Sequence, residues 1–134
     1  MHRLETPVIT QFVRIWPTSW HNAIALRVEF YVNSIGRPVG LSTNVVPDSC
    51  LSASSVRGGD TCAHYGRWQE TRGVGAWIPG LGTPSPTTPL SPMHRPSPTG
   101  AQFLEVDLGR CFPLTALITQ VIMIKCQSKA RKQK

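Results

Sequence analysis

The chain has 134 residues, of which 40% are hydrophobic and 7% aromatic, so one domain or parts of two can form. Twelve prolines and eleven glycines exclude long helices and favour a loop-rich β protein. The net charge of +7 is concentrated in residues 125–134, whose five Lys and Arg leave only +2 for the rest. We therefore interpret the basic character as a solvated tail and expect no nucleic-acid partner.

Two strands are predicted near the N-terminus. Residues 9–16 (ITQFVRIW) and 24–31 (IALRVEFY) both alternate in hydrophobicity, as antiparallel strands with one buried face do. In the second strand the predicted core side chains are Ile24, Leu26, Val28 and Phe30. The segment Pro17–Asn22 is predicted to connect the two strands.

The middle of the chain predicts short extended pieces between loops. Residues 34–40 are predicted to be a linker, because glycines flank a proline there. Leu51–Ser55 (LSASS) predicts a short strand, and Val56–Gly66 predicts an exposed loop with Gly58-Gly59-Asp60 at its tip. Residues 67–78 show no helical period.

The C-terminal part contains a proline-rich segment, two apolar runs and the basic tail. Residues 79–100 hold seven of the twelve prolines and predict a disordered surface insertion. Residues 103–108 (FLEVDL) predict a strand, Gly109-Arg110 a turn, and residues 114–124 a second strand. Since Thr119 and Gln120 interrupt the apolar run 117–124, it cannot span a bilayer.

Four cysteines occur, Cys50, Cys62, Cys111 and Cys126, with spacings that match no zinc site. We expect no metal and no cofactor. One or two disulfides can form if the chain is secreted, but sequence does not decide their pairing. Cys62 and His64 lack the third group that nucleophilic catalysis requires.

The remaining polar and aromatic candidates are interpreted structurally, so we expect no enzymatic activity. Arg27 and Glu29 lie two apart on one strand face, which suits a surface ladder or a buried ion pair. Glu105 and Asp107 also share one strand face and cannot flank a cleft. We expect His21 to cap a turn. Packing or turn-anchoring roles are predicted for three tryptophans, Trp16, Trp20 and Trp77.

Several segments together resemble one family. Gln11–Tyr31 (QFVRIWPTSWHNAIALRVEFY) looks like the closing part of a discoidin, or coagulation factor V/VIII type C, domain. The segments PVGL, VVPDSCLSASS, YGRWQETRGVGAW and QFLEVDLGR…LTALITQ look like its opening half. The motif spacing is most similar to that of the discoidin-domain collagen receptors. The resemblance implies an all-β fold, an incomplete jelly-roll β-sandwich.

The order of the motifs predicts a division of the chain. Residues 1–33 correspond to the last strands of one repeat, residues 41–120 to the first half of a second repeat, and residues 121–134 to a divergent basic tail. We expect a truncated or read-through product. The cysteines that close the family's domains are missing at both ends of the linker. Because those ends are neighbours in the family fold, we predict that residues 9–31 pack against 41–120.

The resemblance implies binding by loops at one end of a passive scaffold. The first such loop corresponds to Val56–Tyr65, and we predict ligand contacts from four of its residues: Arg57, Thr61, His64 and Tyr65. Membrane-binding relatives place aromatic or aliphatic residues at its tip, and this chain has none at residues 57–60. Of three collagen-contact positions, which fall at Arg57, Thr61 and Val74, only Thr61 is retained, so collagen binding is not expected.

The sequence therefore predicts a non-catalytic extracellular recognition module for adhesion, matrix or glycan binding, from a multidomain parent. Its expected partner is an extracellular protein or glycan. Two alternatives remain open: a module that binds anionic phospholipid membranes, and a truncated fragment without independent function. No signal peptide is visible, so the extracellular or ectodomain location is implied by the resemblance alone.

Overall fold

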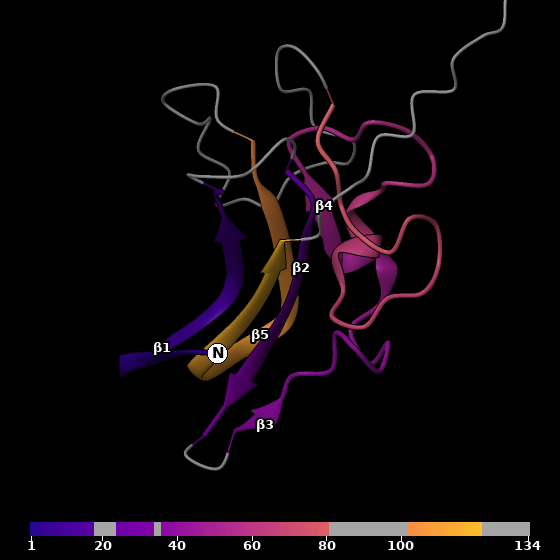
Figure 1. The fold of residues 1–134 in the computed structure, drawn as a ribbon. Coiled ribbons are helices and arrows are strands. Elements are labelled where there is room, and N and C mark those ends of the chain that lie inside the picture. Colours follow the sequence, from indigo (N-terminus) through magenta and orange to yellow (C-terminus); the bar gives the residue numbers. More distant parts are fainter. Residues whose placement is uncertain (18–23, 34–35, 81–101, 122–134) are drawn as a thin grey trace, which may run out of the picture.

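The structure, a computed structural model, describes residues 1–17, 24–33, 36–80 and 102–121, and it is all-β in this part (Figure 1). The strands are β1 (His2–Ile15), β2 (Leu26–Val32), β3 (Arg37–Pro38), β4 (Leu51–Ala53) and β5 (Leu104–Val121). Two short 3-10 turns are the only helical elements described, η1 (Asp48–Cys50) and η2 (Ala63–Gly66). The predicted all-β class is confirmed.

Strand β5 is the centre of the sheet. It pairs with β1 along one edge, and with β4 and then β2 along the other edge, always antiparallel. The short β3 continues the sheet beyond β2, so β1 and β3 are the ends of the order β1-β5-β2-β3. In Figure 1, β5 descends in orange and rises again in yellow, so the central strand of the sheet is strongly bent.

The bend lies where the sequence predicted a turn, and the prediction of two separate strands is wrong. Between the pairs Thr10↔Phe112 and Phe12↔Asp107 the register shifts, and β5 has the extra residues there. Gly109 adopts φ +79°. The Asp107 carboxylate accepts a hydrogen bond from the Gly109 amide (2.8 Å). The glycine therefore makes a β-bulge that bends the strand without ending it.

The core lies between the bent sheet and the loops that follow β3. Alternation in β2 places Leu26, Val28 and Phe30 in this core, as predicted. From β5 the core receives Leu104 and Val106, together with Leu108 and Leu114 on either side of the bulge. Trp77 is fully buried there, as predicted, and its Nε1 donates a hydrogen bond to the Ser55 carbonyl (2.9 Å).

The N-terminal strands pack on the later segment, which confirms the predicted contact between residues 9–31 and 41–120. An ion pair joins Arg14 of β1 to Glu105 of β5 at 2.6 Å, and these two residues are also directly paired in the register. The Arg14 guanidinium lies 4.1 Å from the Phe103 ring centroid and 5.5 Å from that of Trp16. Trp16 is 43% exposed, so of its two predicted roles, core or turn-anchoring, the core position is excluded; its ring packs edge to face on Phe103. It covers the ion pair at the surface instead.

Two boundaries also differ from the predictions. The first strand begins at His2, because its first residues pair with β5 at Ala116 and Leu117. The predicted linker is the second arm of a hairpin, since Arg37 and Pro38 pair with Val32 and Tyr31.

Some predictions fall outside the described residues: those for Trp20, His21 and Cys126, for most of the proline-rich segment, and for nearly all of the basic tail. In the described part, Cys50, Cys62 and Cys111 are free thiols. Among the same residues, no helix has the length and apolar character needed to cross a membrane.

Candidate functional site

The predicted binding loop forms one unit with a second loop at one end of the molecule. Arg57 N donates to Ile78 O (2.9 Å), Ile78 N donates to Thr61 O (3.2 Å), and Val74 N donates to Asp60 O (3.0 Å). The segments 57–61 and 74–78 are therefore held side by side. Leu26 and Trp77 then exchange two backbone hydrogen bonds of 3.0 and 3.1 Å, which fix this unit to the start of β2.

Thr61 closes the tip of the first loop from inside. It is 4% exposed, and its Oγ1 accepts a hydrogen bond from Gly58 N (2.9 Å) and donates one to Gly58 O (3.0 Å). The Cys62 thiol lies beneath the same tip, 3.4 Å from Gly59 O. Thr61 therefore supports the loop through its own hydrogen bonds, and the expectation of a wholly exposed loop is wrong at this residue.

Three side chains stack beside the tip. The rings of His64 and Tyr65 meet edge to face with centroids 4.2 Å apart, and the Arg72 guanidinium lies 5.7 Å from the Tyr65 ring. Gly73 allows this approach, because a Cβ there would meet the Tyr65 ring at 2.9 Å. Arg57 is exposed at the tip. The structure thus brings Arg57, His64 and Tyr65 to one end of the molecule.

Arg72 is a part of this site that the sequence did not single out, and Val74, which falls at a collagen-contact position of the family, was not among the predicted contacts. Arg72 belongs to the stack, and Val74 is 44% exposed beside the tip. The glycines of the segment RGVG (72–75) were the available signal. Gly73 and Gly75 have φ values of +55° and +71°, which favour glycine and turn the second loop toward the first.

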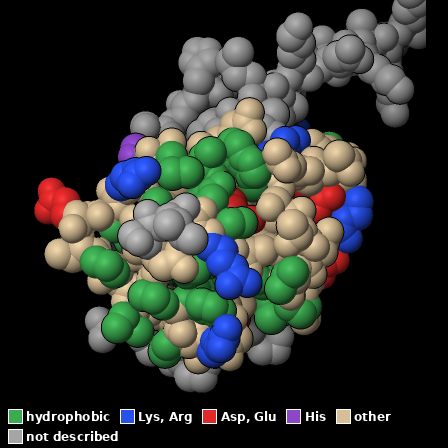
Figure 2. Space-filling model, turned by 90° about the horizontal axis from the view of Figure 1, so that it is seen from below, with side chains coloured by type: hydrophobic (Ala, Val, Ile, Leu, Met, Phe, Trp, Pro, Cys, Tyr) green, Lys and Arg blue, Asp and Glu red, His purple; other side chains and the backbone are tan. Residues whose placement is uncertain are grey.

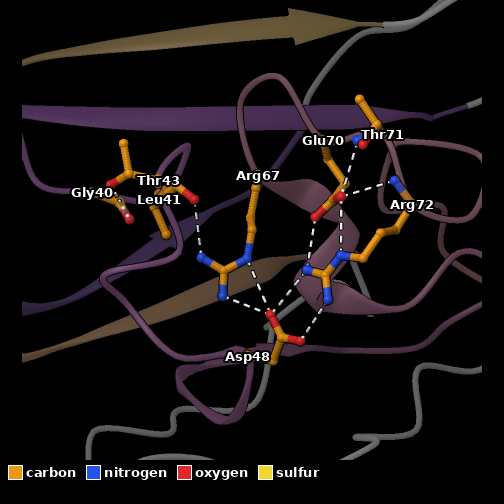
Figure 3. A network of polar contacts seen from close by, with 8 residues as sticks. All are labelled: Gly40, Leu41, Thr43, Asp48, Arg67, Glu70, Thr71 and Arg72. Atoms are coloured by element: carbon orange, nitrogen blue, oxygen red, sulfur yellow. Dashed lines mark hydrogen bonds and ion pairs between the residues drawn. The ribbon is translucent and has the colours of Figure 1, made fainter.

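A charged network anchors the stack to the rest of the fold (Figure 3). Arg67 is buried, and its Nε and Nη2 donate to Asp48 Oδ1 (3.2 and 2.7 Å) while Nη1 donates to Leu41 O (3.0 Å). Arg72 donates to both oxygens of the same carboxylate (3.2 and 3.0 Å) and to Glu70. One aspartate therefore holds two arginines, one from beneath and one from solvent.

These contacts shift the ionisation of both acids. Hydrogen bonds from Arg72, and then from Arg67, lower the pKa of Asp48 to about 2 against partial burial. Hydrogen bonds from Arg72 also lower the pKa of Glu70. The same bonds raise the pKa of Arg72. The network therefore stays fully charged at neutral pH, and the guanidinium of Arg72 is held in place over Tyr65.

Arg27 and Glu29 form neither the predicted surface ladder nor a described ion pair. Glu29 is buried and accepts hydrogen bonds from the backbone of Phe30, Leu41 and Ser42 (3.0, 3.2 and 2.8 Å). Arg27 instead donates to the Gly75 carbonyl, beneath the second loop. Glu29 thus fixes the chain that follows β3, while Arg27 supports the candidate site.

Within residues 1–17, 24–33, 36–80 and 102–121, no three His, Cys, Asp or Glu side chains gather as a metal site would require. Among the described residues, the Cys62 thiol contacts the Gly58 and Gly59 carbonyls and the His64 ring contacts Tyr65, so both side chains are engaged by other groups. What the arrangement can do chemically is present a cation, an imidazole and a phenol ring on a rigid base. Such a surface recognises polar ligands by hydrogen bonds and ring stacking.

Comparison with known proteins found relatives for most of the chain. Rat (Rattus norvegicus) lactadherin is 32% identical over 113 residues, which are 82% of this chain and 24% of the relative. Human (Homo sapiens) neuropilin-2 is 29% identical over 90% of this chain and 12% of its own length. Mouse (Mus musculus) coagulation factor V is 27% identical over 89% of this chain and 5% of its own length.

The chain thus spans a quarter or less of each of these relatives. No family model matches the chain. No solved structure matches it either.

Proposed function

Because the chain carries part of a discoidin (coagulation factor V/VIII type C) domain, we propose that it is a non-catalytic extracellular recognition module that binds a matrix protein or glycan through its loop end. The supporting observation is the polar surface formed by Arg57, His64, Tyr65 and Arg72 on a rigid base. We also propose that residues 1–33 come from the end of one repeat and residues 41–120 from the first half of a second.

Rigidity is what makes this surface suitable for recognition. Backbone hydrogen bonds join the two loops, and an ion pair with Asp48 holds Arg72 from below. A pre-organised surface loses little conformational entropy when it binds, so few polar contacts suffice for measurable affinity. An imidazole and a phenol side by side suit the hydroxyls and apolar faces of a sugar ring.

One observation favours a second function, binding to anionic phospholipid. Val74 is 44% exposed beside the loop tip, and Arg57 and Arg72 lie at the same end. An aliphatic side chain flanked by cations matches a membrane surface, which combines negative headgroups with an apolar interior. Against it, residues 57–60 carry no aromatic or aliphatic side chain that could insert.

The test compares both ligands with the same variants. The purified chain is applied to arrays of matrix glycoproteins and glycans, and to vesicles with and without phosphatidylserine. Arg57→Ala and His64→Ala remove loop-end contacts, whereas Arg37→Ala changes an exposed arginine of β3 in the distant hairpin. Losing one exposed contact worth about 1 kcal/mol should weaken binding roughly fivefold.

We expect glycan or matrix binding that falls with both loop variants and stays unchanged with Arg37→Ala. Binding to vesicles alone, lost when Val74→Ser is introduced, would replace the proposal by the membrane function. Binding that none of the loop variants affects would contradict a loop-end site for either ligand. An unfolding curve for each variant shows that the comparison is made between folded proteins.

A further inference from the structure

A pocket lies at the end of β2 opposite the loop site. β2 starts beside Trp77, at the loop end, and finishes at Val32, where the β2–β3 hairpin begins. There a pocket of about 130 Å³ opens between β1, the hairpin and β5. Its walls include Arg3 and Leu4 from β1, Asn33 and Gly36 from the hairpin, and Thr115 and Ala116 from β5.

The pocket is a consequence of how the strands are paired. After Arg3, which pairs with Ala116, the register of β1 shifts, and regular pairing resumes only at Val8 opposite Leu114. The extra residues of β1 form a bulge, which moves this part of the strand away from β5. The space that a regular ladder would fill is left open beside Arg3 and Leu4.

The described residues of the hairpin wall, Asn33 and Gly36, are held by hydrogen bonds. Thr115 Oγ1 donates to Asn33 O (2.8 Å) and to Tyr31 O (3.3 Å), which ties the turn to β5. Gly36 N closes the turn with a bond to Asn33 O (3.3 Å). Asn33 and Gly36 both have positive φ values, of 55° and 71°, a region that asparagine and glycine tolerate. The pocket therefore exists before any ligand arrives.

The lining combines the guanidinium of Arg3, the amide of Asn33 and an apolar wall, and Met1 also belongs to it. Arg3 is exposed and takes part in none of the described ion pairs, and Arg37 lies exposed on the adjacent strand β3. Thr115 already uses its hydroxyl proton on the backbone, so Arg3 and the Asn33 amide are the side-chain donors that remain in the lining. Leu4 and Ala116 supply the apolar wall.

Two exposed arginines, Arg3 and Arg37, lie on the strands beside the pocket. Figure 2 looks at the molecule from below, toward the end that carries β3 in Figure 1, and shows Lys and Arg side chains spread between hydrophobic ones, with Asp and Glu side chains toward both sides of the view. Glu5, which lies in the β1 bulge two residues after Arg3, is an exposed acid. Such a field attracts a negatively charged partner and raises its encounter rate.

We propose that this pocket binds the carboxylate of an acidic side chain presented by a protein partner. The planar fork of Arg3 matches a carboxylate with two parallel hydrogen bonds, and the Asn33 amide adds a third donor. Leu4 and Ala116 contact the methylene stem that carries the carboxylate. The site is separate from the loop end and does not depend on its function.

The test is an NMR titration of the ¹⁵N-labelled chain with N-acetyl-glutamate amide. N-acetyl-glutamine amide, which has the same shape without the charge, and inorganic phosphate are the comparison ligands. We expect millimolar, saturable shifts at the amides of Asn33, Gly36, Thr115 and Ala116 with the glutamate ligand alone. Arg3→Met should weaken binding at least about tenfold, equivalent to roughly 1.4 kcal/mol.

Three further variants make the result specific. Asn33→Asp places a negative charge at the rim and should also weaken binding, while its left-handed backbone remains tolerated. Arg110→Met removes an exposed arginine that does not line the pocket, and Arg57→Ala alters the loop site. Both should leave the titration unchanged. Equal shifts with the glutamine ligand or with phosphate, or full binding by Arg3→Met, would overturn the proposal.

Discussion

Replacing Arg14 by methionine should destabilise the whole domain, because it leaves a buried charge without its partner. The side chains of Arg14 and Glu105 are only 10% and 5% exposed, and the ion pair joins the N-terminal strand to the centre of the sheet. Breaking a buried pair from one side costs about 3–5 kcal/mol. A small domain has a free energy of unfolding of about 5–15 kcal/mol, so the loss is a large share of it.

The double variant Arg14→Met, Glu105→Leu separates the charge effect from packing. Both charges are then absent, and the new apolar side chains lie against the rings of Trp16 and Phe103. Replacing a buried pair by apolar residues is often close to neutral, so we expect the double variant within about 1 kcal/mol of the parent. The coupling energy between the two positions should then exceed about 2 kcal/mol.

The assay is urea unfolding followed by tryptophan fluorescence, with extrapolation to water. If Arg14→Met is already unfolded without urea, a restored unfolding transition in the double variant still shows that the unpaired charge of Glu105 caused the loss of stability. Strictly additive effects of the two substitutions would refute the reasoning, since they would mean that the charges do not interact. So would a change of less than about 0.5 kcal/mol in Arg14→Met, the size typical of a surface substitution.

Three other predictions follow from the Asp48 network, the Gly73 turn and the core. The pKa of Asp48 lies at about 2, below its usual 3.8, so its ionised form stabilises the fold above about pH 4. This stabilisation is lost as the pH falls toward 2. The variant Asp48→Asn should therefore show a flatter dependence of stability on pH in that window, measured by urea unfolding. Gly73→Ala combines positive φ with contact on the Tyr65 ring and should cost about 1–3 kcal/mol in thermal unfolding, whereas Gly59→Ala, which has open space, should not. The complete chain should unfold in a single cooperative transition by calorimetry, because the described residues share one main core; a flat baseline would instead support a fragment that does not fold by itself.

The elements that depend on local patterns were predictable from the sequence. The alternation in residues 24–31 identified the buried face of β2, because Leu26, Val28 and Phe30 all point to the core. Loop positions were predictable from glycine and proline. Gly109, however, marks either a turn or a bulge in a sequence, and only the partner strand decides between them: β1 continues alongside, so β5 bends instead of reversing into a separate strand.

Contacts between distant residues were beyond such patterns. Asp48 binds Arg67 and Arg72 from 19 and 24 positions away, and nothing local in the sequence marks these three as partners. Trp16 shows a related limit, since a motif match suggests a packing or turn-anchoring role but leaves open whether the ring is buried. It lies near the end of the edge strand, where the ring covers Arg14 and faces solvent.

The central position of β5 also has a consequence for how the protein is made. β1, β2 and β4 all hydrogen-bond to this one strand, which begins at residue 104. During synthesis the earlier strands therefore leave the ribosome long before their shared neighbour is translated. Until then these strands lack the neighbour that joins them, and pairings over such sequence distances form slowly. A chaperone that holds extended apolar segments would find its substrate in this nascent chain, and would have to release it once residue 121 has emerged.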